Sequence, residues 1–126
     1  MPVLRNARSR NLWAGAATVA RLAGAAHSGK IAHDELSGST ITITITSLGR
    51  LGGIVSTPII NHPEVAIVGV NRIVLRPVIS DGAVVARQVM NLSSSFDHRV
   101  VDGALAAGFV QCLCDHLEHP ATLFVE

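Results

Sequence analysis

A strict alternation of isoleucine and threonine constrains the fold of this chain more than any other feature. Residues 40–46 read Thr-Ile-Thr-Ile-Thr-Ile-Thr, and all of them are β-branched. Because side chains along a strand point alternately to its two faces, we expect a strand with a buried isoleucine face and a hydroxyl-bearing face. Gly49, Gly52 and Gly53 follow and are interpreted as turn glycines, since they fit neither a dinucleotide fingerprint nor a phosphate loop.

The remaining periodicity predicts two helices and several further strands. The helices are expected over residues 11–27, with an apolar stripe of Leu12, Ala16, Val19 and Ala23, and from Gly103 to just before Pro120. The further strands are expected over residues 65–70, 73–79, 83–88 and 89–94, with Ser80-Asp81-Gly82 as a hairpin turn. This order predicts an α+β fold, a two-layer sandwich of helices on a mixed, largely antiparallel sheet.

Composition limits the classes of protein to which the chain can belong. It has 126 residues, which suits a single domain, and 48% of them are hydrophobic. Only 15% are charged, against about 25% in average usage. So few charges leave much of the surface apolar, which favours an oligomer. A net charge of +1 provides little attraction for a phosphate backbone, so we expect no nucleic-acid partner. No uncharged run is long enough for a membrane span. Cys112 and Cys114 project on nearly opposite sides of a helix, where a disulfide cannot close, and this favours a cytoplasmic location.

The C-terminal helix carries a set of residues that resembles a metal site. Cys112, His116 and His119 lie at positions i, i+4 and i+7, so a helix places them on one side, as zinc ligands can be. No fourth ligand has a matching pattern, and Cys112 lies in line with Phe109 and Leu113 on an apolar stripe. We therefore predict that Cys112 lies in the core, that His116 and His119 are solvated, and that these residues bind no metal.

The candidate catalytic residues lie between the last strand and the last helix. His98 follows the strand directly, and Asp102 comes four residues later at the start of the helix. A fixed imidazole with a carboxylate nearby has the parts of a general base that works near neutral pH. We expect Asp102 also to cap the helix, and Asp97 and Arg99 to form an ion pair that holds the loop.

The segment Asp97-His-Arg-Val-Val-Asp-Gly103 resembles the motif of the dihydrolipoyl acyltransferase components of 2-oxo acid dehydrogenase complexes. Its core, a histidine followed after three residues by Asp-Gly, is shared with chloramphenicol acetyltransferase and other coenzyme A-dependent acyltransferases. Residues 58–70 and 44–49 with the following Gly-Gly resemble the lipoyl branch specifically. The resemblance covers nearly the whole chain but only the C-terminal half of the family's catalytic domain. Residues 1–126 are thus expected to be one partial catalytic domain, without a lipoyl or peripheral-subunit-binding domain.

This resemblance implies an incomplete chloramphenicol acetyltransferase-like fold and acyl transfer between dihydrolipoamide and coenzyme A. The family's site lies in a channel between the subunits of a trimer, and trimers assemble into larger cores. His98 matches the family's general base, Asp102 matches the acid that supports the site, and Thr46 matches a hydroxyl that hydrogen-bonds the oxyanion. One Thr-Ile unit is extra here, but an insertion of two residues leaves Thr46 on the same face of the strand.

Two other functions remain open from the residues alone. One is a stand-alone coenzyme A-dependent acetyltransferase, and the other is a non-catalytic truncated paralogue that serves as an interaction module. In the leading interpretation coenzyme A is a substrate, and lipoate arrives on another domain or protein. The partners expected are further copies of the chain and either the missing N-terminal half or a full-length paralogue. We expect little activity from these residues alone, and their pattern selects neither an acyl group nor coenzyme A contacts.

Overall fold

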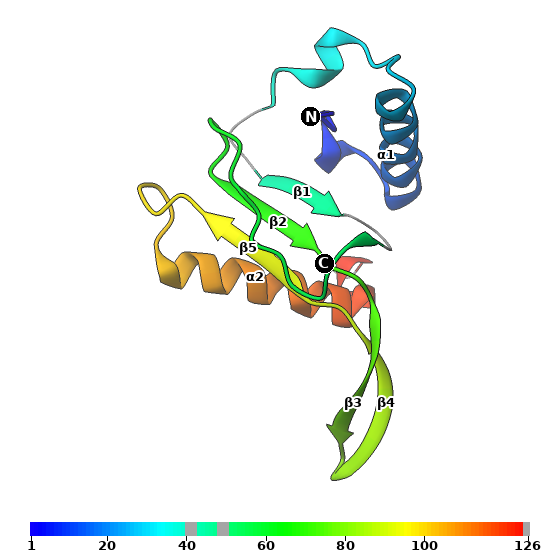
Figure 1. Ribbon diagram of the computed structural model, residues 1–126, viewed down its shortest axis with the longest axis vertical. Helices are drawn as coiled ribbons and strands as arrows, with labels where there is room; N and C mark the ends of the chain where they lie inside the picture. Colours follow the sequence, from blue (N-terminus) through cyan, green and yellow to red (C-terminus); the bar gives the residue numbers. More distant parts are fainter. Residues whose placement is uncertain (40–42, 48–50, 125–126) are drawn as a thin grey trace. The chain divides into compact units, whose positions relative to one another are not determined.

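The computed structural model describes residues 1–39, 43–47 and 51–124. The chain divides into two compact units, Met1–Thr40 and Ile41–Glu126. The first unit contains helix α1 with short 3-10 helices, and the second contains the described strands and helix α2 (Figure 1).

Helix α1 (Leu12–His27) confirms the predicted N-terminal helix, and local chemistry fixes both of its ends. The side chain of Asn11 accepts a hydrogen bond from the backbone N–H of Ala14 at 2.8 Å, which caps the first turn. Beyond the last turn, Gly29 adopts a left-handed φ of +68°, which a helix cannot continue.

The apolar stripe predicted for α1 is wrong, because the first unit buries a different side of the helix. Leu12 and Val19 are exposed, whereas Leu22 is buried. The neighbouring Arg21 forms an ion pair with Glu35 at 2.6 Å, and Glu35 lies in the 3-10 helix His33–Leu36. Contacts with a segment beyond the helix, rather than the periodicity of its apolar residues, thus determine the buried side.

The second unit is built on a three-stranded sheet in the order β1-β2-β5 (Figure 1). β1 (Ile43–Ser47) runs parallel to β2 (Ala66–Val70), and β5 (Leu92–Phe96) runs antiparallel to β2 on its other side. Residues 66–69 are buried, so the middle strand forms the core of this unit. A run of apolar residues without alternation suits a strand that is covered on both faces.

Helix α2 (Gly103–Glu118) packs on one face of the sheet at its β5 side (Figure 1). The Phe109 ring of α2 meets the Phe96 ring of β5 edge to face, with centroids 6.2 Å apart. This packing of helix on a mixed sheet confirms the predicted α+β class. Within the described residues, no helix has the length and apolar character that a membrane crossing requires.

A stretch of residues 51–65, which precedes β2, lies against the opposite face of the sheet. Two serines of β5, whose side chains point to the face opposite Phe96, bind this segment. Ser93 Oγ accepts a hydrogen bond from the backbone N–H of Ser56 at 3.1 Å, and Ser95 Oγ donates to the Pro58 carbonyl at 2.6 Å.

A β-hairpin separates β2 from β5. β3 (Val74–Ser80) and β4 (Ala83–Val89) pair in antiparallel fashion as a two-stranded sheet of their own. The turn residues Asp81 and Gly82 have φ values of 51° and 77°, the left-handed pair that a tight two-residue hairpin turn requires. The predicted hairpin is therefore confirmed, within one residue at each end.

The strand predicted over residues 89–94 is wrong in its position. β4 ends at Val89, and β5 begins at Leu92 in the other sheet. Between them, the side-chain amide of Asn91 donates to the Ile54 carbonyl at 2.9 Å, and the Asn91 carbonyl accepts from the backbone N–H of Asn71. These contacts with distant segments, rather than any turn motif, separate the two strands.

The Ile-Thr strand forms over residues 43–47, but its predicted burial is wrong. Ile45 is 73% exposed, whereas Thr46 is half-buried. Among the described strands, β1 pairs only with β2. Helix α2 packs against β5 at the other side of the sheet, so the helix does not cover Ile45. Residues 40–42 of the motif lie outside the described part of the chain.

Replacing Gly69 by alanine should destabilise the second unit. A Cβ atom at this position of β2 would lie 2.9 Å from Ser56 Oγ and 3.5 Å from the Ser93 carbonyl oxygen. The Ser56 hydroxyl would have to rotate away from β2, so we expect Gly69→Ala to lower the free energy of unfolding by about 1 kcal/mol in urea titrations.

Gly108→Ala is the matched control, because a Cβ there meets nothing within 4 Å and alanine favours a helix. It should raise the unfolding free energy by up to about 1 kcal/mol. A Gly69→Ala chain as stable as the wild type would show that the Ser56 side chain is not held against β2.

Candidate active site

His98 lies in a turn that joins β5 to α2, and its side chain is exposed. The turn is organised by Asp97, whose backbone carbonyl accepts hydrogen bonds from the N–H groups of Val100 at 3.0 Å and Val101 at 2.9 Å. The Asp97 N–H in turn donates to the Val65 carbonyl at 2.8 Å, next to the start of β2. The backbone before His98 is therefore held by the buried strand.

The predicted ion pair between Asp97 and Arg99 is confirmed. The Asp97 carboxylate accepts hydrogen bonds from Arg99 Nη2 at 2.6 Å, from its Nε at 2.9 Å and from its backbone N–H at 3.0 Å. These bonds to Arg99, with a smaller contribution from the charge of His62, lower the pKa of Asp97 to about 2. The same pairing raises the pKa of Arg99. Two charged residues thus flank His98 and hold each other.

Asp102 caps α2, as predicted. Its carboxylate accepts a hydrogen bond from the backbone N–H of Leu105 at 2.8 Å, and its carbonyl accepts from Ala106 at 3.0 Å. An aspartate at this position also suits the positive end of the helix dipole. The turn that carries His98 is therefore fixed at both ends, by Asp97 on the strand side and by Asp102 on the helix side.

Thr46 lies in β1 beside a small cavity on the face of the sheet away from α2. It aligns with Gly69 of β2, which has no side chain to fill the space next to it. The cavity has a volume of about 190 Å³. Its lining consists mainly of small residues, namely Thr46, Ser47, Gly52, Gly53, Ser56, Pro58, Gly69, Val70 and Asn71.

Thr46 and His98 do not meet within one copy of the chain. Thr46 aligns across β2 with Ser93, whereas His98 lies beyond Phe96 at the other end of β5. The three residues from Ser93 to Phe96 span about 10 Å, and two strand spacings add about 10 Å across the sheet. A reacting carbon has to lie about 3 Å from both groups. One copy therefore presents two half-sites at opposite ends of its sheet.

A buried polar network beside the cavity was not predicted from the sequence. Asn71 is only 7% exposed, and its side-chain amide donates to the Asn91 carbonyl at 3.0 Å and to Ser93 Oγ at 2.8 Å. Ser93 Oγ also accepts from the backbone of Ser56. The residues of this network are far apart in the sequence and form no motif. Only the pairing of the strands shows that Asn71 and Ser93 together hold the wall of the cavity.

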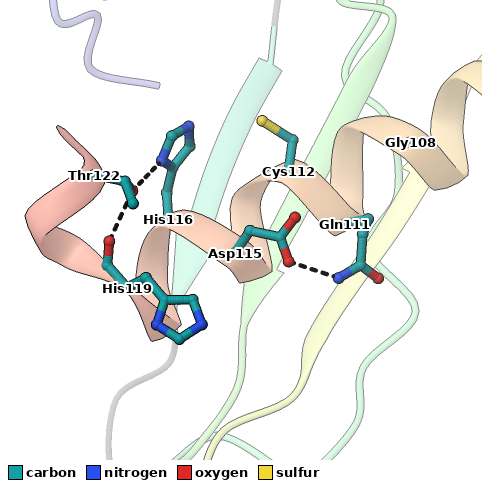
Figure 2. A pocket seen from close by; sticks show the side chains of 7 residues that line it. All are labelled: Gly108, Gln111, Cys112, Asp115, His116, His119 and Thr122. Atoms are coloured by element: carbon teal, nitrogen blue, oxygen red, sulfur yellow. Dashed lines mark hydrogen bonds between the residues drawn. The ribbon is translucent and has the colours of Figure 1, made fainter. Parts of the chain in front are cut away.

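The three candidate metal ligands line a groove of about 400 Å³ along α2 and the 3-10 helix Pro120–Phe124 (Figure 2). Cys112 and His116 lie on the same side of the helix, but His119 points away from them (Figure 2). His116 Nδ1 lies 3.0 Å from Thr122 Oγ1, which itself donates to the His119 carbonyl. In the described part of the chain, no three potential ligands converge on one point. Cys112 is exposed, so its prediction as a core residue is wrong.

Comparison with known sequences identifies the family. Residues 1–125 match the family model of the 2-oxoacid dehydrogenases acyltransferase catalytic domain. The chain is 68% identical over 126 residues to the lipoamide acyltransferase component of the branched-chain alpha-keto acid dehydrogenase complex of Pseudomonas aeruginosa. It is 40% identical to the dihydrolipoyllysine-residue acetyltransferase component of the pyruvate dehydrogenase complex of Staphylococcus aureus. In both cases it aligns over its whole length but spans 29% of the relative.

Solved structures of the same family also resemble the chain. One is the dihydrolipoamide acetyltransferase of Azotobacter vinelandii, studied for the role of a serine, a histidine and an asparagine in its catalytic mechanism. It matches with a TM-score of 0.90 and 43% identity, over 98% of this chain and 50% of that one. Another, the cubic core of the pyruvate dehydrogenase multienzyme complex, matches with a TM-score of 0.84 and 45% identity over 92% of this chain and 47% of that one. The chain therefore belongs to the catalytic-domain family of the 2-oxoacid dehydrogenase acyltransferases.

Removing the Arg99 cation should change the titration of Asp97. We expect Arg99→Ala to bring the pKa of Asp97 from about 2 back towards its ordinary value of 3.8, as followed by carboxyl-carbon NMR. Because the pKa is lowered in the folded chain, the pair stabilises it above about pH 4, and this contribution is lost as the pH falls through about 2. An unchanged Asp97 titration in the variant would show that Arg99 does not hold this carboxylate.

Proposed function

We propose that this chain carries acyl-transfer chemistry between dihydrolipoamide and coenzyme A within a 2-oxo acid dehydrogenase complex. Its family and the names of its relatives support this activity. Coenzyme A is then a substrate, lipoate arrives on another domain or protein, and the complex works in the cytoplasm. The chain spans only part of its relatives, so the activity is proposed for the chain as it works with the remainder of a catalytic domain.

The proposed catalytic groups are His98, Thr46 and Asp102. In the Azotobacter vinelandii enzyme, the serine lies 52 residues before the histidine and the asparagine lies four residues after it. Here Thr46 lies 52 residues before His98 and Asp102 lies four residues after it, the same separations. A hydroxyl at position 46 is therefore retained, whereas an acid replaces the amide at position 102.

The roles follow from the chemistry of each side chain. The His98 imidazole takes the proton from the coenzyme A thiol, and the thiolate attacks the carbonyl carbon of the acyl-dihydrolipoamide thioester. The Thr46 hydroxyl donates a hydrogen bond to the oxyanion of the tetrahedral intermediate. When the intermediate collapses, the dihydrolipoamide sulfur leaves and the imidazolium returns the proton to it. Asp102 acts by fixing the turn that presents His98.

The observation that carries this proposal is the separation of Thr46 and His98 at opposite ends of one sheet. Within a single copy, a carbon atom that contacts Thr46 is out of reach of His98. We therefore infer that each site combines Thr46 of one copy with His98 of another. Such a head-to-tail contact closes into a ring when the copies are related by rotation, and a trimer is the ring we propose.

The acyl group we propose is a short branched one. The relatives named for branched-chain alpha-keto acid dehydrogenase complexes are 68% and 64% identical to this chain, against 40% for the acetyltransferase relative. The cavity beside Thr46 has a volume of about 190 Å³. An apolar cavity of about 150 Å³ holds a benzene molecule, so there is room for four or five carbon atoms. The thiols of coenzyme A and dihydrolipoamide each end a long arm that has to lead out of the site. This leaves the cavity for the acyl chain.

Mixing two inactive variants tests the shared site. His98→Ala should lower transfer from isobutyryl-coenzyme A to dihydrolipoamide by about 10²–10⁴-fold, and Thr46→Val by about 10²–10³-fold. Refolded together in equal amounts, the two variants should recover about a quarter of the wild-type rate, because random assembly pairs an intact Thr46 with an intact His98 at that frequency. The control mixes Thr46→Val with the double variant Thr46→Val/His98→Ala. No copy in this mixture carries an intact Thr46, so the rate should not rise above that of Thr46→Val alone.

The assay is run on the chain alone and together with the remainder of the catalytic domain of the Pseudomonas aeruginosa relative. Activity that appears only with the added segment supports a divided catalytic domain. No recovery in the mixture of single variants would overturn the shared site. No acyl transfer by the wild type in either preparation would overturn the catalytic proposal and favour a non-catalytic interaction module.

The acyl preference should depend on Ser56, which lies over Gly69 on the wall of the cavity. In Ser56→Phe, the larger side chain occupies the cavity, so kcat/KM for isobutyryl-coenzyme A should fall more than about tenfold. The value for acetyl-coenzyme A should change less than about threefold. Ser56→Ala is the control, since the backbone N–H that bonds Ser93 is kept, and it should retain both activities. An equal loss with both substrates would place the acyl group elsewhere.

A further inference from the structure

The groove of about 400 Å³ along α2 brings together two of the residues that resemble a metal site in the sequence. Cys112 and His116 both line it, and Figure 2 shows them on the same side of the helix. The Cys112 thiol is exposed, and the His116 imidazole is half-buried. A sulfur donor and a nitrogen donor thus face the same groove.

The hydrogen bonds of Thr122 determine which ring nitrogen of His116 is free. Thr122 Oγ1 donates its single hydrogen to the His119 carbonyl at 2.7 Å, so it has none left for the imidazole. His116 Nδ1 lies 3.0 Å from the same oxygen and must therefore carry the hydrogen that it donates. In a neutral imidazole the unshared electron pair is then on Nε2, which points away from Thr122 (Figure 2). Metal-binding histidines are commonly held in this way, through the ring nitrogen that does not bind the metal.

The helical spacing of the pair suits coordination of one ion by both side chains. Residues at i and i+4 have Cβ atoms about 5–6 Å apart, and zinc lies about 2.3 Å from a sulfur ligand and about 2.0 Å from a nitrogen ligand. Two histidines at this spacing bind zinc in helical metal sites, so the side chains can span the remaining distance. Gly108 lies one turn before Cys112, and a Cβ there would meet nothing within 4 Å. Space for an ion beside the thiol is therefore open.

The charge of the groove also suits a cation. Asp115 lines the same groove, and its carboxylate accepts a hydrogen bond from Gln111 at 2.8 Å. No lysine or arginine is among the described residues that form the lining. Thiolate and imidazole ligands favour zinc and copper, whereas magnesium and calcium favour oxygen ligands. The donors and the charge together select a zinc-like ion.

We propose that Cys112 Sγ and His116 Nε2 bind one zinc ion in this groove, with Thr122 as the residue that positions the imidazole. The thiol binds as a thiolate, and its proton passes to water. Zinc in proteins usually has four ligands, so two positions stay open for water or for a donor from outside the chain. The expectation of no metal rested on a buried Cys112 and a missing fourth ligand. The thiol is exposed, and an open site needs no fourth protein ligand.

This site is separate from the proposed catalytic groups. Gly103 begins α2 next to the turn that carries His98, and at 1.5 Å per residue His116 lies about 20 Å further along the helix. Cys112→Ala should therefore transfer acyl groups at the wild-type rate. Loss of acyl transfer in this variant would contradict a zinc site that is independent of catalysis.

Cobalt(II), a spectroscopic substitute for zinc, tests the ligands one by one in the reduced full chain. A near-ultraviolet charge-transfer band from thiolate to cobalt should appear during titration and disappear when zinc is added. Cys112→Ala should remove the band, and His116→Ala should weaken cobalt binding at least tenfold. Thr122→Val keeps the shape of the side chain but loses the hydroxyl, and it should weaken binding about 10–100-fold.

Two matched variants are the controls, because each removes the same kind of donor outside the pair. Cys114 lies two positions from Cys112 and projects to nearly the opposite side of the helix, so Cys114→Ala should bind cobalt like the wild type. His119 points away from the pair (Figure 2), and its contact with Thr122 uses only the backbone carbonyl. His119→Ala should therefore also bind like the wild type. Far-UV circular dichroism verifies that all variants are folded.

The absence of a charge-transfer band in the wild type would overturn the zinc site. So would unchanged affinity in His116→Ala or loss of the band in Cys114→Ala, because other ligands would then hold the ion. Unchanged affinity in Thr122→Val would overturn its positioning role. Analytical ultracentrifugation with zinc should leave the association state unchanged at one ion per chain. Two chains joined by each ion would replace the open site by a shared one and likewise overturn the proposal.

Discussion

The pairing of β2 with a strand on each side determines where every candidate catalytic group lies. β1 runs parallel to it and β5 antiparallel, so the C-terminal end of β1 and the C-terminal end of β5 point in opposite directions. Thr46 occupies the first end and His98 follows the second. A slip in this register by two residues would move Thr46 by about 7 Å relative to the cavity wall.

Around this sheet, polar contacts set the two half-sites by different means. The His98 turn depends on neighbours in the sequence, since Asp97 binds Arg99 and Asp102 caps the next helix. The cavity beside Thr46 depends on distant residues, since Asn71 and Ser93 hold Ser56 over Gly69. The exposed turn is suited to entering a neighbouring copy, and the walled cavity is suited to receiving it.

The same distinction explains how much the sequence could predict. The cap at Asp102, the Asp97–Arg99 pair and the Asp-Gly hairpin turn each depend on residues within a few positions, and all three were predicted correctly. The start of β5 and the buried side of α1 depend on contacts with segments far along the chain, and both were predicted wrongly. Thr46 was proposed from a resemblance, and its separation from His98 became apparent only from the strand order.

The most direct test of the shared site is a cryo-electron microscopy structure of the assembled protein bound to coenzyme A. If each site lies about 3 Å from both groups, Thr46 Oγ1 of one copy should lie about 6 Å from His98 Nε2 of its neighbour, with the coenzyme A sulfur between them. A structure in which His98 of every copy lies far from Thr46 of all the others would contradict the shared site.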